Sequence, residues 1–218
     1  MSRFARVALR SLPRARPTVT PARLALPSTP ASSRVPAMSR SYATPPDTPS
    51  AGDTGLAHAQ TLLEDGTRAL EDGDLSKARA LYTESVGARA TSGGWFNLGV
   101  VEYQLGNLPA AIDAWRSSIA LEPSADAYTN LGSAYMMSKP PNAPEAIKAL
   151  TAAMSISPED AEIQYNLAAI LESTDNLDTA LTLYKKAHAG GIERAAANAR
   201  NVGGKILAKK LKEEGENK

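Results

Sequence analysis

Cysteine is absent from this chain of 218 residues, which also contains only two histidines, two tryptophans and two phenylalanines. Without cysteine, neither a disulfide framework nor a thiolate metal site can form. His58 and His188 are far apart in the sequence, so we expect surface or packing roles for both rather than metal ligation or catalysis. No run of about 20 apolar residues occurs, so no membrane span is expected. We therefore expect no metal and no cofactor.

Acidic residues are missing from the first 42 positions. Residues 1–42 carry eight arginines and no lysine, and serine, proline and alanine fill most of the other positions. An amino terminus of this kind is typical of a mitochondrial transit peptide, which is removed after import. Phe4 to Leu12 can form a short amphipathic helix, and the prolines from Pro13 onward prevent its extension. The arginines interrupt every apolar run that a secretory signal would need.

The end of this segment predicts where it is cleaved. Arg40-Ser41-Tyr42-Ala43 resembles the mitochondrial processing pattern of Arg, any residue and Tyr, with cleavage before Ala or Ser. We therefore predict cleavage between Tyr42 and Ala43 and a mitochondrial location, with the matrix favoured. The alternative is an uncleaved, disordered basic tail. Residues 43–55 are mostly Thr, Pro, Ser, Gly and Asp, and we expect a disordered linker there.

Removing the leader changes the charge of the chain. Eight of the 24 basic residues lie in residues 1–42, so the rest carries 16 basic and 23 acidic residues, a net charge of −7. Nucleic-acid binding without sequence preference depends on Lys and Arg that neutralise phosphates. We therefore expect no nucleic-acid partner.

A short sequence pattern repeats through the remaining chain. A tripeptide of Asn, Leu and a small residue recurs at separations of 33 and 36 residues: Asn97-Leu98-Gly99, Asn130-Leu131-Gly132 and Asn166-Leu167-Ala168. Each copy is followed by an alanine-led apolar helix. A period of this length is typical of stacked helical repeats, in which no unit can bury its apolar face alone. Such an array presents a surface rather than a catalytic pocket.

The unit from about residue 94 to 123 shows the pattern best. Its first helix carries Trp95, Leu98, Gly99 and Tyr103, and its second helix carries Ala111, Trp115 and Ile119 before Pro123. This run resembles the tetratricopeptide repeat, which has Trp, Leu-Gly and Tyr on the first helix, Ala and a large residue on the second, and a closing Pro. A glycine fits position 99 because the two helices approach closely there.

The resemblance implies an all-α fold, an α-solenoid of about four helix-turn-helix repeats over residues 56–190. The repeats are expected at about 59–91, 92–124, 125–160 and 161–191, with two extra residues in the third turn. Residues 192–214 are expected to form a capping helix, followed by a tail at 215–218. Its lysines suit a solvated face, and the alternative is docking to acidic partners or anionic lipid.

Members of the tetratricopeptide repeat family bind peptides or helices of partner proteins in a concave groove lined by the first helices. Carried over to this chain, the resemblance implies a groove formed by the exposed sides of those helices: Leu63, Thr67, Phe96, Val100, Tyr103, Gln104, Thr129, Asn130, Ser133, Met136, Met137, Tyr165, Asn166, Ala169 and Glu172. This set would supply apolar pockets and amides for a peptide backbone. The alternative is that its aromatic residues pack within the array and its asparagines belong to the repeat pattern.

Positive charge is missing from this expected groove. Family members that capture the acidic carboxyl terminus of chaperones pair its carboxylates with Lys and Arg. Here the first helices of the second to fourth units contain neither, apart from Lys139 at the edge of a turn. We therefore predict that the chain does not bind chaperone tails.

These observations predict a non-catalytic mitochondrial scaffold, adaptor or assembly factor that binds a partner polypeptide in its groove. One alternative is a non-catalytic subunit of a larger mitochondrial enzyme or ribosomal complex. Another is an RNA-binding helical repeat protein, which the net charge of −7 disfavours. Catalysis by the chain itself is disfavoured because carboxylates such as Glu102 and Glu172 should face water and keep ordinary acidity.

Overall fold

The computed structural model describes residues 51–216, and within them every regular element is a helix. In chain order the helices are α2 (Ala51–Glu71), α3 (Leu75–Ala88), α4 (Ser92–Gln104), α5 (Leu108–Leu121), α6 (Ala125–Met137), α7 (Ala143–Ile156), α8 (Ala161–Ser173), α9 (Leu177–Ala189) and α10 (Glu193–Glu216). The expected transit peptide and its cleavage site at Tyr42 and Ala43 lie outside the described residues. The all-α prediction is confirmed for residues 51–216.

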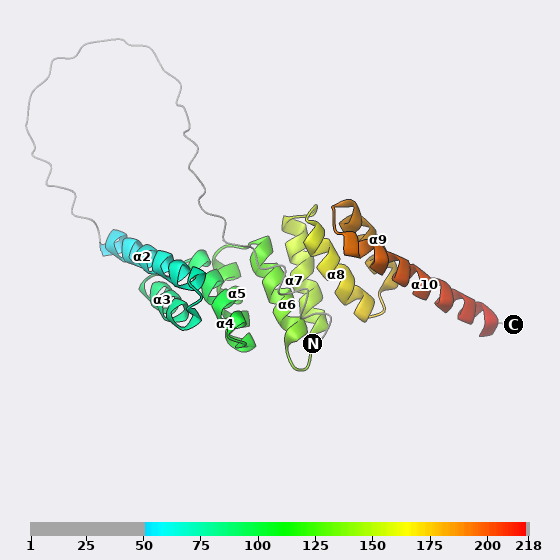
Figure 1. The fold of residues 1–218 in the computed structure, drawn as a ribbon, viewed down its shortest axis with the longest axis horizontal. Coiled ribbons are helices and arrows are strands. Elements are labelled where there is room, and N and C mark those ends of the chain that lie inside the picture. The colour runs from blue at the N-terminus through cyan, green and yellow to red at the C-terminus, as the bar shows by residue number, and fades with distance from the viewer. Residues whose placement is uncertain (1–50, 217–218) are drawn as a thin grey trace, which may run out of the picture.

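The helices are arranged as a row of hairpins. Four pairs, α2 with α3, α4 with α5, α6 with α7 and α8 with α9, follow one another along the long axis of the molecule, and α10 packs beside α9 (Figure 1). Each pair also contacts the next pair along the chain. This arrangement confirms the predicted solenoid of four hairpins and a final helix.

The start of α2 corrects one predicted boundary. Residues 51–55, expected at the end of the disordered linker, belong to this helix, which begins at Ala51. Adding residues to an existing helix costs far less free energy than starting one. The helix therefore extends beyond its first apolar contacts into a segment whose composition alone suggests a loop.

The turns inside the pairs follow the expected chemistry. Gly73, Gly106 and Asp175 have φ values of 81°, 80° and 62°, in the left-handed region that glycine and aspartate tolerate best. The turn of the third pair spans residues 138–142, five residues, whereas the other three turns span three residues each. The predicted insertion in the third turn is therefore confirmed.

The helix starts also follow from the sequence. Ser124 caps α6 by accepting a hydrogen bond from the backbone N–H of Ala127 at 3.2 Å. Pro109 and Pro144 lie in the first turns of α5 and α7, where a missing backbone N–H leaves no hydrogen bond unmade. These local signals fix the phase of the helix pairs along the chain.

Small residues allow the two helices of a pair to pack closely. A Cβ atom built on Gly99 would lie 2.6 Å from Nε1 of Trp115, and one on Gly132 would lie 2.9 Å from Cγ of Leu150. Gly66 faces Tyr82 in the same way at 2.7 Å. The large residues of these contacts are buried, so each glycine leaves room for the main apolar side chain of its pair.

Candidate functional site

The first helices α2, α4, α6 and α8 carry all of the predicted groove residues. The Tyr103 hydroxyl on α4 contacts the sulfur of Met137 on α6, and Tyr165 on α8 contacts Asn198 on α10. We call the sides of α2, α4, α6 and α8 that carry the predicted residues the inner wall.

Five of the predicted groove residues are buried rather than exposed. Their exposed fractions are 6–9%, and the residues are Tyr103, Thr129, Asn130, Tyr165 and Asn166. The expectation that they lie on an exposed surface is wrong. Tyr103 packs against Trp115 of its own pair and Met137 of the next, and Tyr165 packs against Tyr184, so the tyrosines pack within the array, as in the alternative that the sequence left open.

The burial of the asparagines follows from the stacking of the pairs. Asn97 lies beside the hydroxyl group of Tyr82, on the second helix of the preceding pair. By the repeat spacing, Trp115 and Leu150 occupy the places of Tyr82 next to Asn130 and Asn166, and neither residue offers a hydroxyl. Accordingly, Nδ2 of Asn130 and both amide atoms of Asn166 have no hydrogen-bond partner among the described residues.

At α8 the inner wall is covered by α10. The Arg194 guanidinium lies 4.3 Å from the centre of the Tyr165 ring, and Asn198 donates a hydrogen bond to the Tyr165 hydroxyl at 3.1 Å. Lys205 pairs with Glu172 at 2.7 Å. Two of the predicted residues, Tyr165 and Glu172, are therefore engaged within the chain, and the open part of the wall ends at α8.

What remains open on α4, α6 and α8 is a mainly apolar strip. We call its partly exposed members the inner strip: Phe96, Val100, Met136, Met137 and Ala169. All five pack against the hydrophobic core while keeping part of their surface accessible. Gln104, exposed, and Ser133, half-buried, lie beside them, and Leu63 and Thr67 continue the wall on α2.

The hydroxyl groups of the wall are turned back onto their own helices. Thr67 donates to the backbone carbonyl of Leu63 at 2.9 Å, Thr129 to that of Ala125 at 2.8 Å, and Ser133 to that of Thr129 at 3.1 Å. The hydroxyl groups of the partly exposed Thr67 and Ser133 are therefore already bonded within the chain, which adds to the apolar character of the wall.

The electrostatics of the wall match the sequence expectation. Helices α4, α6 and α8 contain no Lys or Arg. Their carboxylates include Asp126 near the start of α6 and Glu162 near the start of α8, and Glu162 pairs with Arg194. The surface next to the inner strip is therefore acidic at the start of α6, and at α8 the carboxylates of Glu162 and Glu172 are paired with Arg194 and Lys205 of α10.

Glu102 differs from the prediction that it faces water. It is 5% exposed, accepts from Nε of Arg79 on α3 at 2.7 Å, and accepts from Nδ2 of Asn107 at 2.9 Å. The spacing of 33 residues aligns Glu102 with Tyr135, so Glu102, and not Tyr103, occupies the tyrosine position of the pattern. One sequence signal could have revealed that Glu102 is buried against Arg79. The tyrosine of this unit, Tyr103, lies one position later than the repeat pattern requires, so Glu102 takes the tyrosine position.

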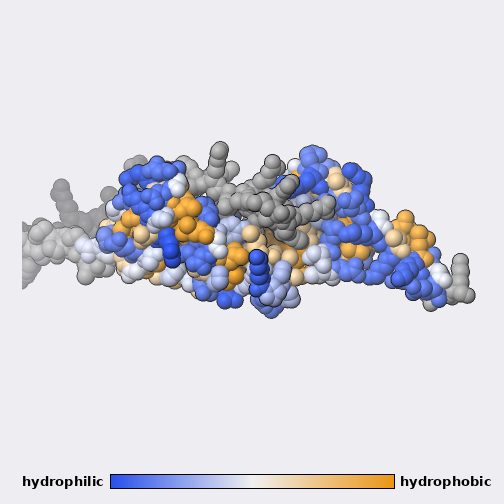
Figure 2. Space-filling model, turned by 60° about the horizontal axis from the view of Figure 1, so that its bottom comes forward, coloured by the Kyte–Doolittle hydropathy of each residue, from blue (hydrophilic) through white to orange (hydrophobic). Residues whose placement is uncertain are grey.

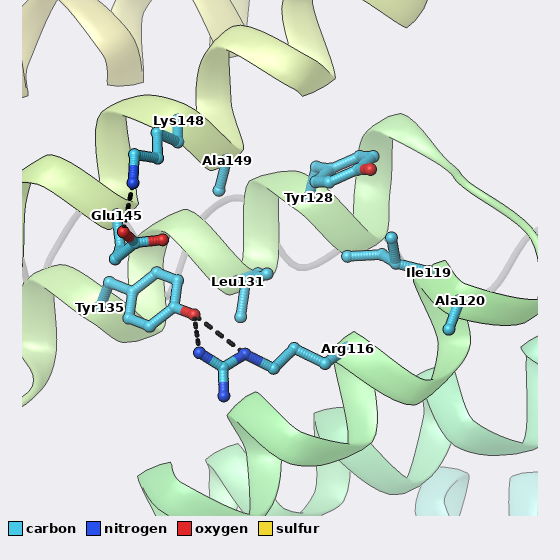
Figure 3. A pocket seen from close by; sticks show the side chains of 9 residues that line it. All are labelled: Arg116, Ile119, Ala120, Tyr128, Leu131, Tyr135, Glu145, Lys148 and Ala149. Carbon is cyan, nitrogen blue, oxygen red and sulfur yellow. Dashed lines mark hydrogen bonds and ion pairs between the residues drawn. The ribbon is translucent and has the colours of Figure 1, made fainter.

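A hollow of about 330 Å³ lies away from the inner wall, between α5 and α7 and above α6 (Figure 3). Its floor is apolar, with Leu131 and Ile119, and its polar rim is already paired. Arg116 donates to the Tyr135 hydroxyl at 2.7 Å, and Lys148 pairs with Glu145 at 2.6 Å. None of the predicted groove residues lines it.

A second hollow, of about 230 Å³, lies at the end of the inner strip. Its lining includes Phe96 together with polar groups from the ends of α4, α5 and α6. Ser92 donates to Glu122 across it at 2.8 Å. A side chain of a bound peptide that lies on the inner strip could enter this hollow beside Phe96.

A model of the tetratricopeptide repeat matches residues 63–126, 98–153 and 137–199, three overlapping stretches that together span more than half of the chain. This chain belongs to the tetratricopeptide repeat family. The third match extends into α10, which therefore carries part of the repeat pattern. Repeats of this family form protein–protein interaction scaffolds.

Several solved structures have the same fold. The crystal structure of MamA protein is 24% identical, with a TM-score of 0.60, and the match covers 73% of this chain and 93% of that chain. MamA residues 41 to the end from Desulfovibrio magneticus RS-1 are 18% identical, with a TM-score of 0.62 and coverage of 72% and 90%. YrrB, described as a TPR protein with an unusual peptide-binding site, is 18% identical, with a TM-score of 0.58 and coverage of 68% and 76%. At these identities the likeness concerns the fold.

No curated protein matches this tetratricopeptide chain in sequence. Among residues 51–216, no helix combines the length and the apolar character needed to cross a membrane. In the same part of the chain, no group of three or more His, Asp or Glu side chains is placed to hold a metal ion.

Proposed function

We propose that this chain is a non-catalytic mitochondrial scaffold or assembly factor that binds a segment of a partner protein along the inner strip. The observation that carries the proposal is the inner strip itself, a row of partly exposed apolar side chains on consecutive first helices. A row of this kind fits an extended peptide or one face of an amphipathic helix. The peptide-binding site named for YrrB supports the same kind of ligand.

The partner segment has a definable chemistry. It presents apolar side chains to Val100, Met136 and Met137, since methionines adapt to ligands of different shape. Its flanking charges are neutral to positive, because Asp126 lies beside the strip and α4, α6 and α8 hold no cation. An acidic segment would bury carboxylates there without a partner, which costs free energy.

The mitochondrial location rests on the amino-terminal sequence. The eight arginines and the absence of acids in residues 1–42 favour import, and the pattern ending at Tyr42 favours cleavage before Ala43. The matrix is the compartment proposed. A non-catalytic subunit of a larger mitochondrial complex would use the same surface, so the two roles differ only in how long the partner stays bound.

The experiment is proximity labelling by the full chain in living cells, with partners identified from purified mitochondria. We expect a mitochondrial chain that begins at Ala43 and a set of labelled partners that is lost in Met136→Glu, which adds a charge to the inner strip. The matched control is Thr151→Glu, on an exposed position of α7. Labelling of cytosolic proteins only would overturn the location, and equal partner loss in both variants would overturn the site.

A further inference from the structure

Helix α10 has the sequence pattern of a first helix of a repeat. Asn201-Val202-Gly203 follows the Asn166-Leu167-Ala168 tripeptide by 35 residues, close to the earlier spacings of 33 and 36. Val202 is fully buried, and the leucines at the equivalent positions of α4, α6 and α8 are buried too. Helix α10 therefore occupies the place of the first helix of a fifth pair, and it runs without a break through Gly203 and Gly204.

The described residues contain no second helix for that pair, and the surface of α10 that such a helix would cover is exposed. In the first three pairs, a Cβ on the pattern glycine would lie within 3 Å of a large side chain, whereas at Gly203 nothing lies within 4 Å. Beside it on α10, Leu207 and Leu211 are 59% and 60% exposed. A hydrophobic patch lies at this end of the array in the space-filling view (Figure 2).

The residues of this exposed surface share one face of α10. At 100° per residue, Gly203, Leu207 and Leu211 fall within one face, and Arg200 and Glu214 continue it on either side. Arg200 and Glu214 are exposed and form no ion pair among the described residues. The other side of α10 is already engaged, since Lys205 pairs with Glu172 and Lys209 with Asp175.

The opposite end of the array is built differently. On α2, the side that would face a preceding repeat carries the exposed residues Thr61, Glu64 and Arg68, and Arg68 pairs with Asp65 at 3.0 Å. This side of α2 is therefore polar and suited to contact with solvent. Head-to-tail stacking of two copies would place these polar groups on Leu207 and Leu211, so it does not explain the open apolar face.

We propose that α10 pairs with α10 of a second copy, antiparallel and centred on Leu207. In this register position 203 of one helix faces position 211 of the other, so each Leu211 fills the space beside the other copy's Gly203, as the second helix does within a pair. Position 200 faces position 214, so Arg200 of each copy meets Glu214 of the other. The face is therefore complementary to itself in both shape and charge.

Another segment of this chain fits the face less well. Residues 1–42 carry eight arginines and no acidic residue, so they would place like charges beside Arg200 and Lys210. The free end of α10 extends past the last hairpin (Figure 1), which leaves room for a second helix along it. The dimer does not depend on what the inner strip binds.

Sedimentation velocity of the full chain over a range of concentrations tests the proposal. We expect a reversible dimer whose dissociation constant rises by about tenfold or more in Leu207→Glu. The matched control, Ala208→Glu, adds the same charge on a different face of α10 and should leave the dimer unchanged, with circular dichroism confirming that both variants fold. A monomer at all concentrations overturns the proposal, as does a dimer that Leu207→Glu leaves intact.

Charge reversal tests the antiparallel register. Arg200→Glu and Glu214→Arg should each weaken the dimer, and the double variant should restore it. Because the chain has no cysteine, Leu207→Cys should give a single covalent dimer under oxidising conditions, and Ala208→Cys should give none. Failure of the double variant to restore the dimer would overturn the register.

Discussion

The same substitution, glycine to alanine, should have opposite effects on stability at Gly99 and at Gly203. In the interior of a helix, alanine is favoured over glycine by about 1 kcal/mol. At Gly203 the added methyl group meets nothing within 4 Å. We therefore expect Gly203→Ala to raise the free energy of unfolding of the monomer by about 1 kcal/mol.

At Gly99 the added methyl group meets the indole ring of Trp115 at 2.6–2.9 Å. The ring is 1% exposed and its N–H donates to the carbonyl of Phe96 at 3.2 Å, so it cannot move aside without losing that bond. Overpacking of this kind costs about 3 kcal/mol at the upper end of its usual range. After the gain in helix propensity, Gly99→Ala should lower the free energy of unfolding by about 2 kcal/mol.

Urea unfolding followed by circular dichroism measures both effects, at a protein concentration low enough to keep the chain monomeric. We expect the transition midpoint to fall for Gly99→Ala and to rise for Gly203→Ala. A Gly99→Ala variant as stable as the wild type would contradict the close helix approach inferred from the repeat pattern. Destabilisation by Gly203→Ala would contradict the uncovered surface of α10 at this glycine.

Three further outcomes can be measured on the same protein. Glu102→Ala should lower the free energy of unfolding by about 1–2 kcal/mol, since Arg79 is half exposed and water can solvate it, whereas Asp113→Ala at an exposed pair should change it by less than about 0.5 kcal/mol. Burial raises the pKa of the Tyr184 hydroxyl, and its hydrogen bond to Glu172 raises it further; an unfolded tyrosine loses its proton near pH 10, so the contribution of Tyr184 to stability should be constant below about pH 10 and be lost above it, and stability above about pH 10 should fall less steeply in Tyr184→Phe. Calorimetry with an acidic chaperone-tail peptide should give no heat of binding, and low-micromolar affinity would refute the charge argument.

The positions at which each repeat begins and ends could be predicted, because short-range sequence signals determine them. The spacing of the tripeptides, Ser124 at a helix start and the glycines in the turns each act within a few residues of where they occur. The beginning of α2 at Ala51 could not be predicted in this way, because an existing helix extends into residues that would not start one.

The exposure of the candidate site was less predictable. Tyr165 and Glu172 belong to a first helix, and the sequence of that helix does not show that α10 lies across both of them. Considered alone, Glu102 would be expected at the surface. Its place at the tyrosine position of the repeat indicates burial, and in the structure it pairs with Arg79. In both cases burial depends on a neighbouring repeat, so a helix read alone cannot reveal it.

Site-specific photo-crosslinking in mitochondria tests directly whether the inner strip binds a partner polypeptide. A photo-reactive benzoylphenylalanine is placed at position 136 on α6 in one chain and at position 151 on α7 in another, and irradiation captures whatever touches each site. We expect a crosslinked partner from position 136 and none from position 151. A partner captured from position 151 alone would contradict it.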